Sequence, residues 1–206
     1  MKNLKYVISF LFVIAIISGC AKMKNDDISF VKTAAAPTDE NTKFLITQDN
    51  SGIVTITPTG AGVVSYDIYF GDNTTDPVNV LAGKNTTHQY AEGNYTVKIV
   101  AKGMTGETTE TSSPLDVTFR APENVQANVA QDVHTVTVSA SALYATGGFK
   151  VYFGDEDNET PVDLAADATV SHTYTEAGDY TIKVVALSGG AATTTVDKDI
   201  TVYNTL

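Results

Sequence analysis

The stretch VSYDIYFGD, residues 64–72, is repeated further along the chain as GGFKVYFGD, residues 147–155. A second stretch, GNYTVKIVA at residues 93–101, is repeated as GDYTIKVVA at residues 178–186. The spacing between the two copies is nearly the same for both stretches. Self-similarity at a fixed spacing indicates that one structural unit occurs twice in the chain.

Within each copy the side chains alternate with a period of two. Tyr66, Ile68 and Phe70 fall on one face of the first stretch, while Asp67 and Tyr69 fall on the other. This alternation is typical of a strand that is buried on one face. Further expected strands, each bounded by Gly, Asp, Asn or Pro, are Ile53–Thr57, Val133–Ser139, Ala191–Val196 and Ile200–Tyr203. About seven short strands per copy predict an all-β fold of two tandem β-sandwiches.

The motifs resemble a known family. A Tyr-x-x-x-Phe-Gly-Asp strand and turn is followed by His-x-Tyr, at His88 and His172, and then by Gly-x-Tyr-Thr. This order is similar to the polycystic kidney disease (PKD) repeat, and the resemblance covers residues 42–206. It implies a PKD-type, immunoglobulin-like sandwich of the kind common in surface-exposed and secreted bacterial proteins. The family's usual Trp-Asp before Phe-Gly-Asp is replaced by Ile68-Tyr69 and Val151-Tyr152.

The N-terminus predicts a lipoprotein. A short cationic start is followed by an apolar run too short to cross a bilayer, which is the plan of a signal peptide. Residues 17–20, Ile-Ser-Gly-Cys, resemble the lipobox of bacterial lipoproteins, which implies cleavage before Cys20 and acylation of its thiol. Ala21 and the late acidic pair Asp26-Asp27 favour a Bacteroidota-like lipoprotein of the outer membrane, exposed on the cell surface.

These observations predict four segments. Residues 1–19 are the signal peptide, residues 20–41 a lipidated flexible tether, residues 42–120 the first PKD-like domain and residues 121–206 the second. The tether is expected because this stretch has no sustained period. The boundary at Ala121-Pro122 offers few side chains to bury, so we expect the two domains to fold independently.

Composition excludes several classes of function. The chain of 206 residues has 13 Lys and Arg against 24 Asp and Glu, so its net charge of −11 opposes binding to nucleic-acid phosphates. Cys20 is the single cysteine, which excludes an intramolecular disulfide. The chain contains no Gly-x-Ser-x-Gly or His-Glu-x-x-His motif, and we therefore expect no enzymatic activity. The matched histidines, His88 and His172, are expected to be packed or hydrogen-bonded within each domain.

Two sets of residues are candidates for ligand binding. An oxygen-rich cluster could hold calcium, while the alternative is that its acids cap their own turn or are solvated; the cluster comprises Asp155, Glu156, Asp157, Asn158 and Glu159. Tyr69 and Tyr152 face outward, where an aromatic ring can stack on a sugar. The alternative is that Lys98 and Lys183 on the neighbouring strand half-cover these rings. Tyr95 and Tyr180 resemble the corner tyrosine of immunoglobulin-like sandwiches.

The sequence therefore favours a non-enzymatic lipoprotein that acts as a spacer and interaction platform, accessory to glycan capture. This glycan role follows from family analogy alone. The expected partners are the membrane, through acylated Cys20, and a polysaccharide or an envelope protein; no cofactor other than calcium is expected. The alternative function is a structural or adhesin-like subunit that binds protein, for example through a sheet edge.

Overall fold

The computed structural model describes residues 35–204, and of these, residues 36–204 belong to one compact unit. The signal peptide, Cys20 and most of the predicted tether lie outside the described residues. Every regular element of the described part is a β-strand. The strands of the first copy are β1 (Thr38–Ile46), β2 (Ile53–Ala61), β3 (Val63–Tyr69), β4 (Val78–Leu81), β5 (Thr86–Gln89), β6 (Gly93–Gly103) and β7 (Thr108–Val117). Those of the second are β8 (Glu123–Asp132), β9 (Thr135–Leu143), β10 (Phe149–Tyr152), β11 (Val162–Leu164), β12 (Val170–Thr173), β13 (Gly178–Leu187) and β14 (Thr193–Val202).

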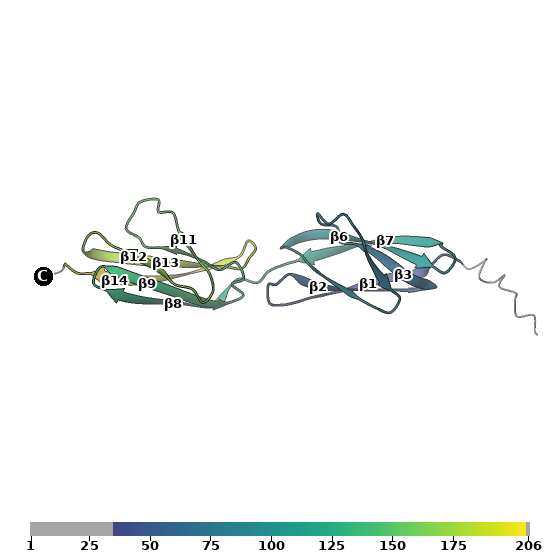
Figure 1. Ribbon diagram of the computed structural model, residues 1–206, viewed down its shortest axis with the longest axis horizontal. Coiled ribbons are helices and arrows are strands. Elements are labelled where there is room, and N and C mark those ends of the chain that lie inside the picture. The colour runs from purple at the N-terminus through teal and green to yellow at the C-terminus, as the bar shows by residue number, and fades with distance from the viewer. Residues whose placement is uncertain (1–34, 205–206) are drawn as a thin grey trace, which may run out of the picture. The chain divides into compact units, whose positions relative to one another are not determined.

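Each copy is a sandwich of a three-stranded and a four-stranded sheet. In the first sandwich the sheets have the orders β1-β2-β5 and β4-β3-β6-β7. The second sandwich repeats them as β8-β9-β12 and β11-β10-β13-β14, and all pairings are antiparallel. Figure 1 shows the strands of each sandwich in two layers. The prediction of two tandem immunoglobulin-like β-sandwiches is confirmed.

The two sandwiches have separate hydrophobic cores, each built from the inward faces of its own strands. The first contains Tyr66, Ile68 and Phe70, all at most 3% exposed, together with the inward residues of β2, β6 and β7. In the second, Phe149, Val151 and Phe153 take the same places. The alternation expected from the sequence is thus confirmed in both copies, because the residues that it assigned to the inner face are the ones buried between the two sheets.

The first sandwich begins earlier in the chain than predicted. Residues 38–41, which the sequence analysis placed in the tether, form the start of β1. The reason is a pair of equivalent contacts: Thr109 Oγ1 donates to the carbonyl of Pro37, and Thr194 Oγ1 donates to that of Pro122. Both prolines are buried and directly precede the first strand of their sandwich. The recurrence of Ala-Pro, at residues 36–37 and 121–122, is the sequence signal that marks this boundary.

Two strand assignments also change. The expected strands Ala191–Val196 and Ile200–Tyr203 are one continuous strand, β14, because it pairs with β13 without interruption from Thr193 to Val202. The expected strand Val133–Ser139 starts at Thr135 instead. Val133 has a positive φ of 51° and forms the turn between β8 and β9. A β-branched residue rarely adopts this conformation, so its place in a turn could not be read from its type.

Candidate functional site

A cluster of aromatic rings and one His–Asp pair lies at the Phe-Gly-Asp turn of the first sandwich. The His88 ring stacks on Phe70 with centroids 3.8 Å apart and planes 7° from parallel. Its Nε2 lies 2.7 Å from Oδ2 of Asp72, which belongs to the turn itself. The Tyr90 hydroxyl donates to the carbonyl of Phe70 over 3.0 Å. We call this set of Phe70, Asp72, His88 and Tyr90 the turn cluster.

The second sandwich contains the same cluster. His172 stacks on Phe153 with centroids 4.4 Å apart, and its Nε2 lies 2.7 Å from Oδ2 of Asp155. The Tyr174 hydroxyl donates to the carbonyl of Phe153 over 2.8 Å. Each histidine therefore fixes the turn after the third strand of its sandwich against the fifth strand. This confirms the prediction that both histidines are packed and hydrogen-bonded.

The turn cluster shifts the acidity of its own groups. Burial by itself raises the pKa of Asp72, but hydrogen bonds from the His88 ring and from the backbone amide of Thr74 outweigh it and lower that pKa to about 2. Burial, reinforced by the nearby acids Asp72 and Asp155, raises the pKa of Tyr90 and of Tyr174. These tyrosines stay protonated and serve as hydrogen-bond donors at neutral pH. Both tyrosines belong to the His-x-Tyr motif, but their residue type alone did not predict this role.

The corner tyrosines are also confirmed. The Tyr95 hydroxyl donates to the carbonyl of Ala91 over 3.1 Å, and the Tyr180 hydroxyl donates to that of Glu176 over 3.0 Å. Both bonds span four residues and hold the loop before the sixth strand of the sandwich. This is the arrangement of the tyrosine corner in immunoglobulin-like folds.

The candidate calcium cluster has much of its oxygen capacity engaged by the protein. The carboxylate of Glu159 accepts hydrogen bonds from the backbone amides of Phe153 and Gly154, and Asp155 is engaged with His172. Asn158 adopts a positive φ of 61° within the turn. Over residues 35–204, no group of three or more His, Cys, Asp or Glu side chains is arranged to hold a metal ion. The geometry of Asp155 and Glu159 is that of the alternative weighed for this cluster, in which acids cap their own turn.

Tyr69 and Tyr152 lie on the outer faces of the four-stranded sheets, as expected. The ammonium group of Lys98 lies 4.3 Å from the centroid of the Tyr69 ring, and that of Lys183 lies 5.5 Å from the Tyr152 ring. Both tyrosines are half-buried. The lysines therefore cover part of each ring, by a cation–π contact, and leave a smaller area for stacking on a ligand.

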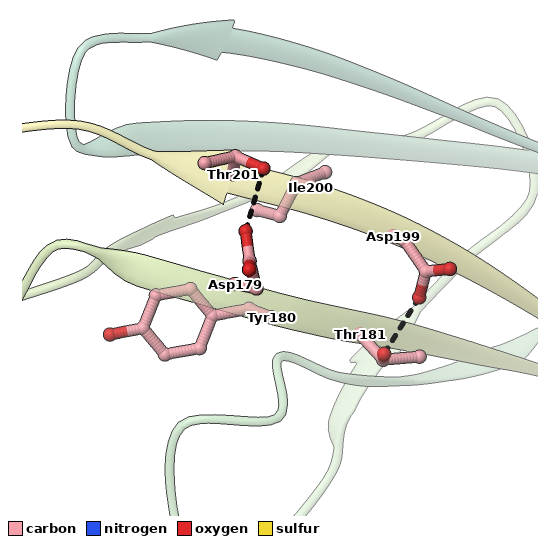
Figure 2. A pocket seen from close by; sticks show the side chains of 6 residues that line it. All are labelled: Asp179, Tyr180, Thr181, Asp199, Ile200 and Thr201. Atoms are coloured by element: carbon pink, nitrogen blue, oxygen red, sulfur yellow. Dashed lines mark hydrogen bonds between the residues drawn. The ribbon is translucent and has the colours of Figure 1, made fainter.

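A shallow polar hollow of about 390 Å³ lies on β13 and β14. Figure 2 shows two hydrogen bonds that cross between these strands: Thr181 to Asp199 and Thr201 to Asp179, each 2.7 Å long. The two carboxylates are thus engaged by the facing hydroxyls. Such cross-strand pairs stabilise the sheet.

Cys20 lies outside the described residues, so its acylation stays a prediction. Among the residues that the structure describes, no helix is long and apolar enough to span a membrane.

No family model and no curated protein sequence matches this chain. Among solved structures it is similar to a two-domain fibronectin type III segment of chicken tenascin, with a TM-score of 0.45 and 11% identity over 81% of this chain and 99% of that one. It is also similar to fibronectin(III)-like modules of CbhA from Clostridium thermocellum (TM-score 0.33, 17% identity, 79% and 93% covered). A third similar structure is the central fibronectin-III array of RIM-binding protein (TM-score 0.30, 12% identity, 82% and 69% covered). The assignment of the chain to tandem immunoglobulin-like sandwiches rests on its own strand order and register.

Proposed function

We propose that this chain is a lipid-anchored protein of a bacterial outer membrane, exposed on the cell surface, whose two PKD-type sandwiches act as a non-catalytic spacer and interaction platform. The lipobox ending at Cys20 supports the anchor. In this proposal the acylated Cys20 holds the chain to the bilayer, and two or three acyl chains give stable attachment.

The observation that carries the platform role is the duplicated turn cluster. In both copies, the histidine, the aspartate and the tyrosine are all engaged with one another or with the backbone of the same turn. Side chains that could do acid–base chemistry are thus used to stabilise the fold. In this proposal a partner binds to the outer faces of the sheets, because the polar groups of the turn cluster are already engaged within the fold.

We further propose that the platform is accessory to glycan capture. The support is the repeated row on each four-stranded sheet, in which Tyr69 lies beside Lys98 and Tyr152 beside Lys183. A half-covered ring on a flat face contributes about 1 kcal/mol to stacking. Since association costs several kcal/mol, the affinity of this chain alone is expected to be about millimolar or weaker.

Calorimetry with soluble polysaccharides tests the glycan role on a version of the chain that begins at Ala21. Weak heats that disappear in the double variant Tyr69→Ala, Tyr152→Ala are expected. Tyr203→Ala is the matched control, because Tyr203 is 72% exposed and follows the last strand. Binding that persists in the double variant, or that is lost in the control, would contradict a site on these rows.

The second candidate function is a structural or adhesin-like subunit that binds protein. Two of the long edge strands argue against attachment by strand addition at their own edges, because β7 contains Pro114 and β14 contains Asp197, Lys198 and Asp199. Proline and charges on an edge strand oppose pairing with another chain. Photo-crosslinking in intact cells, from a probe at Tyr69 or Tyr152, distinguishes the two: a defined protein adduct at either position would favour the protein-binding role.

A further inference from the structure

The loop between the first two strands differs between the copies. In the first sandwich the amide of Thr47 bonds to the carbonyl of Ile53, which leaves the loop Gln48–Gly52 between them. In the second, Asp132 pairs directly with Thr135, so that only Val133 and His134 form the loop. The loop between the first two strands is therefore longer in the first sandwich than in the second.

Asn50 lies in this longer loop and is bonded to residues beyond its own sandwich. Its side chain is buried, with the residue only 5% exposed. Its Nδ2 donates to the carbonyl of Arg120 over 2.8 Å and to that of Tyr144 over 3.0 Å, and Ser188 O lies 3.4 Å away. Its Oδ1 accepts from the amide of Arg120 over 2.9 Å. One side chain thus satisfies the backbone of the connecting segment and of two loops of the second sandwich.

Glu92 makes a second set of contacts of the same kind. Its Oε1 accepts from the amide of Phe119 over 3.0 Å, and its Oε2 accepts from the amide of Ala191 over 2.6 Å. Phe119 belongs to the connecting segment, whereas Ala191 lies in the loop between β13 and β14. A β-carbon on Gly190 would overlap Oε2 of Glu92, so a larger residue at that position would displace the carboxylate from this place.

Comparison of the two copies shows that these residues are special to this place in the chain. The corner tyrosines align Glu92 with Ala177, since their hydroxyls bind Ala91 and Glu176 respectively. The hairpin bonds Gly103–Glu107 and Ser188–Ala192 align Gly189 with Met104 and Gly190 with Thr105. Both sides of the Glu92 contact therefore differ between the copies. The first sandwich has a carboxylate acceptor where the second has alanine. The second has two glycines where the first has Met104 and Thr105.

We propose that Asn50 and Glu92 lock the two sandwiches together, so that they form one rigid unit and not two modules joined by a free linker. We call Asn50, Glu92 and Gly190 the junction lock. The sequence predicted that few side chains are buried at the boundary near Ala121-Pro122. In this proposal Asn50 is one such buried side chain, and it holds the boundary through hydrogen bonds. The inference does not depend on which partner the proposed platform binds, because it concerns the chain alone.

The lock acts through polar groups, since the two apolar cores stay separate. Buried backbone groups need hydrogen-bond partners, and Asn50 supplies both a donor and an acceptor to them. Without its side chain these groups must turn to water, which requires the two sandwiches to separate locally. Loss of the lock is thus expected to increase relative motion and leave each core intact.

Distances between spin labels, measured by pulsed electron paramagnetic resonance, test this in the chain that begins at Ala21, which contains both cores and no cysteine. Labels are placed at Lys43→Cys and Asn128→Cys, two exposed positions in different sandwiches. A narrow distance distribution is expected, and it should broaden at least twofold in Asn50→Gly. Glycine is chosen because Asn50 has a φ of 61°, which glycine adopts without strain.

Glu92→Gln provides an independent variant, because the glutamine side chain has one acceptor oxygen where the carboxylate has two. The distance distribution is expected to broaden as in Asn50→Gly. Asn85→Gly and Glu107→Gln are matched controls at exposed positions and should leave the distribution unchanged. Circular dichroism checks that each variant is folded. The proposal is overturned if the parent chain already gives a broad distribution, or if neither Asn50→Gly nor Glu92→Gln broadens it.

Discussion

Glu40 offers a substitution that should stabilise the first sandwich. It lies in β1, and its Oε1 is buried with no hydrogen-bond partner among the described residues. The equivalent residue of the second sandwich is Val125, which packs against the hydrophobic core there. The alignment is set by Asp39 and Asn124, which precede them and share a φ near 55° (56° and 54°). Glu40→Val therefore copies a solution that the chain itself contains.

The expected gain follows from the desolvated oxygen. A buried polar group without a partner costs about 1–3 kcal/mol, and Glu40 is only partly buried, so Glu40→Val should raise the free energy of unfolding by about 1–2 kcal/mol at pH 7. Burial, with a smaller contribution from the charge of Asp39, raises the pKa of Glu40. A carboxyl whose pKa is raised on folding favours the folded state when protonated, and its cost appears as the pH rises through its unfolded pKa, about 4.3. The gain should therefore be smaller at pH 4 than at pH 7.

Urea denaturation followed by circular dichroism at both pH values measures this gain. Glu107→Val, in an exposed turn, is the control and should change stability by less than about 0.5 kcal/mol. The reciprocal change Val125→Glu should destabilise the second sandwich. A loss of stability in Glu40→Val would show that the carboxylate has a favourable partner, and a gain of equal size at pH 4 would show that its charge does not matter.

Three further predictions concern the anchor, the core and the turn cluster. Cys20→Ala should leave a protein that is not labelled by a fatty-acid probe in cells; a labelled variant would contradict the lipobox. Phe70→Ala should destabilise the first sandwich by about 3–5 kcal/mol in urea denaturation, whereas Tyr69→Ala should cost about 1 kcal/mol; the reverse order would place the wrong face of β3 in the core. The pKa of Asp72 is lowered to about 2 on folding, so the stability that its carboxylate contributes should be lost as the pH falls from about 4 to 2. Asp72→Asn should remove this part of the acid sensitivity in urea denaturation. An unchanged dependence of stability on pH would show that the contacts of Asp72 with His88 and Thr74 do not stabilise the fold.

Much of the fold could be predicted because its signal is periodic. Residues such as Ile68 and Phe70 alternate with polar neighbours, and a strand with one buried face must keep that alternation. Because the unit is repeated, a role predicted for a residue in one copy also applied to its equivalent in the other, as with His88 and His172. Glu40 escaped this reasoning. It was predicted to lie near the end of the tether, and only the structure shows that it belongs to β1, at the irregularity between Thr38 and Asn41, with one carboxylate oxygen buried.

The candidate sites were harder to predict, because the residue type does not reveal its partner. Asp155 and Glu159 looked like calcium ligands by composition, yet His172 and two backbone amides engage them in the folded chain. Tyr69 was placed on the correct face, but the position of Lys98 over its ring depends on the register between β3 and β6.

The sequence by itself thus determined the repeat and the buried faces of its most regular strands, and it predicted the lipid anchor. Only the tertiary structure decided how the strands divide between sheets and what the ends of the sandwiches do. Asn50 and Glu92 show the reason: their contacts with Arg120, Ser188 and Ala191 join segments that are 70 to 138 residues apart in the chain. Contacts between loops follow no period, and a polar residue in a loop looks the same in sequence whether it faces water or holds two domains together.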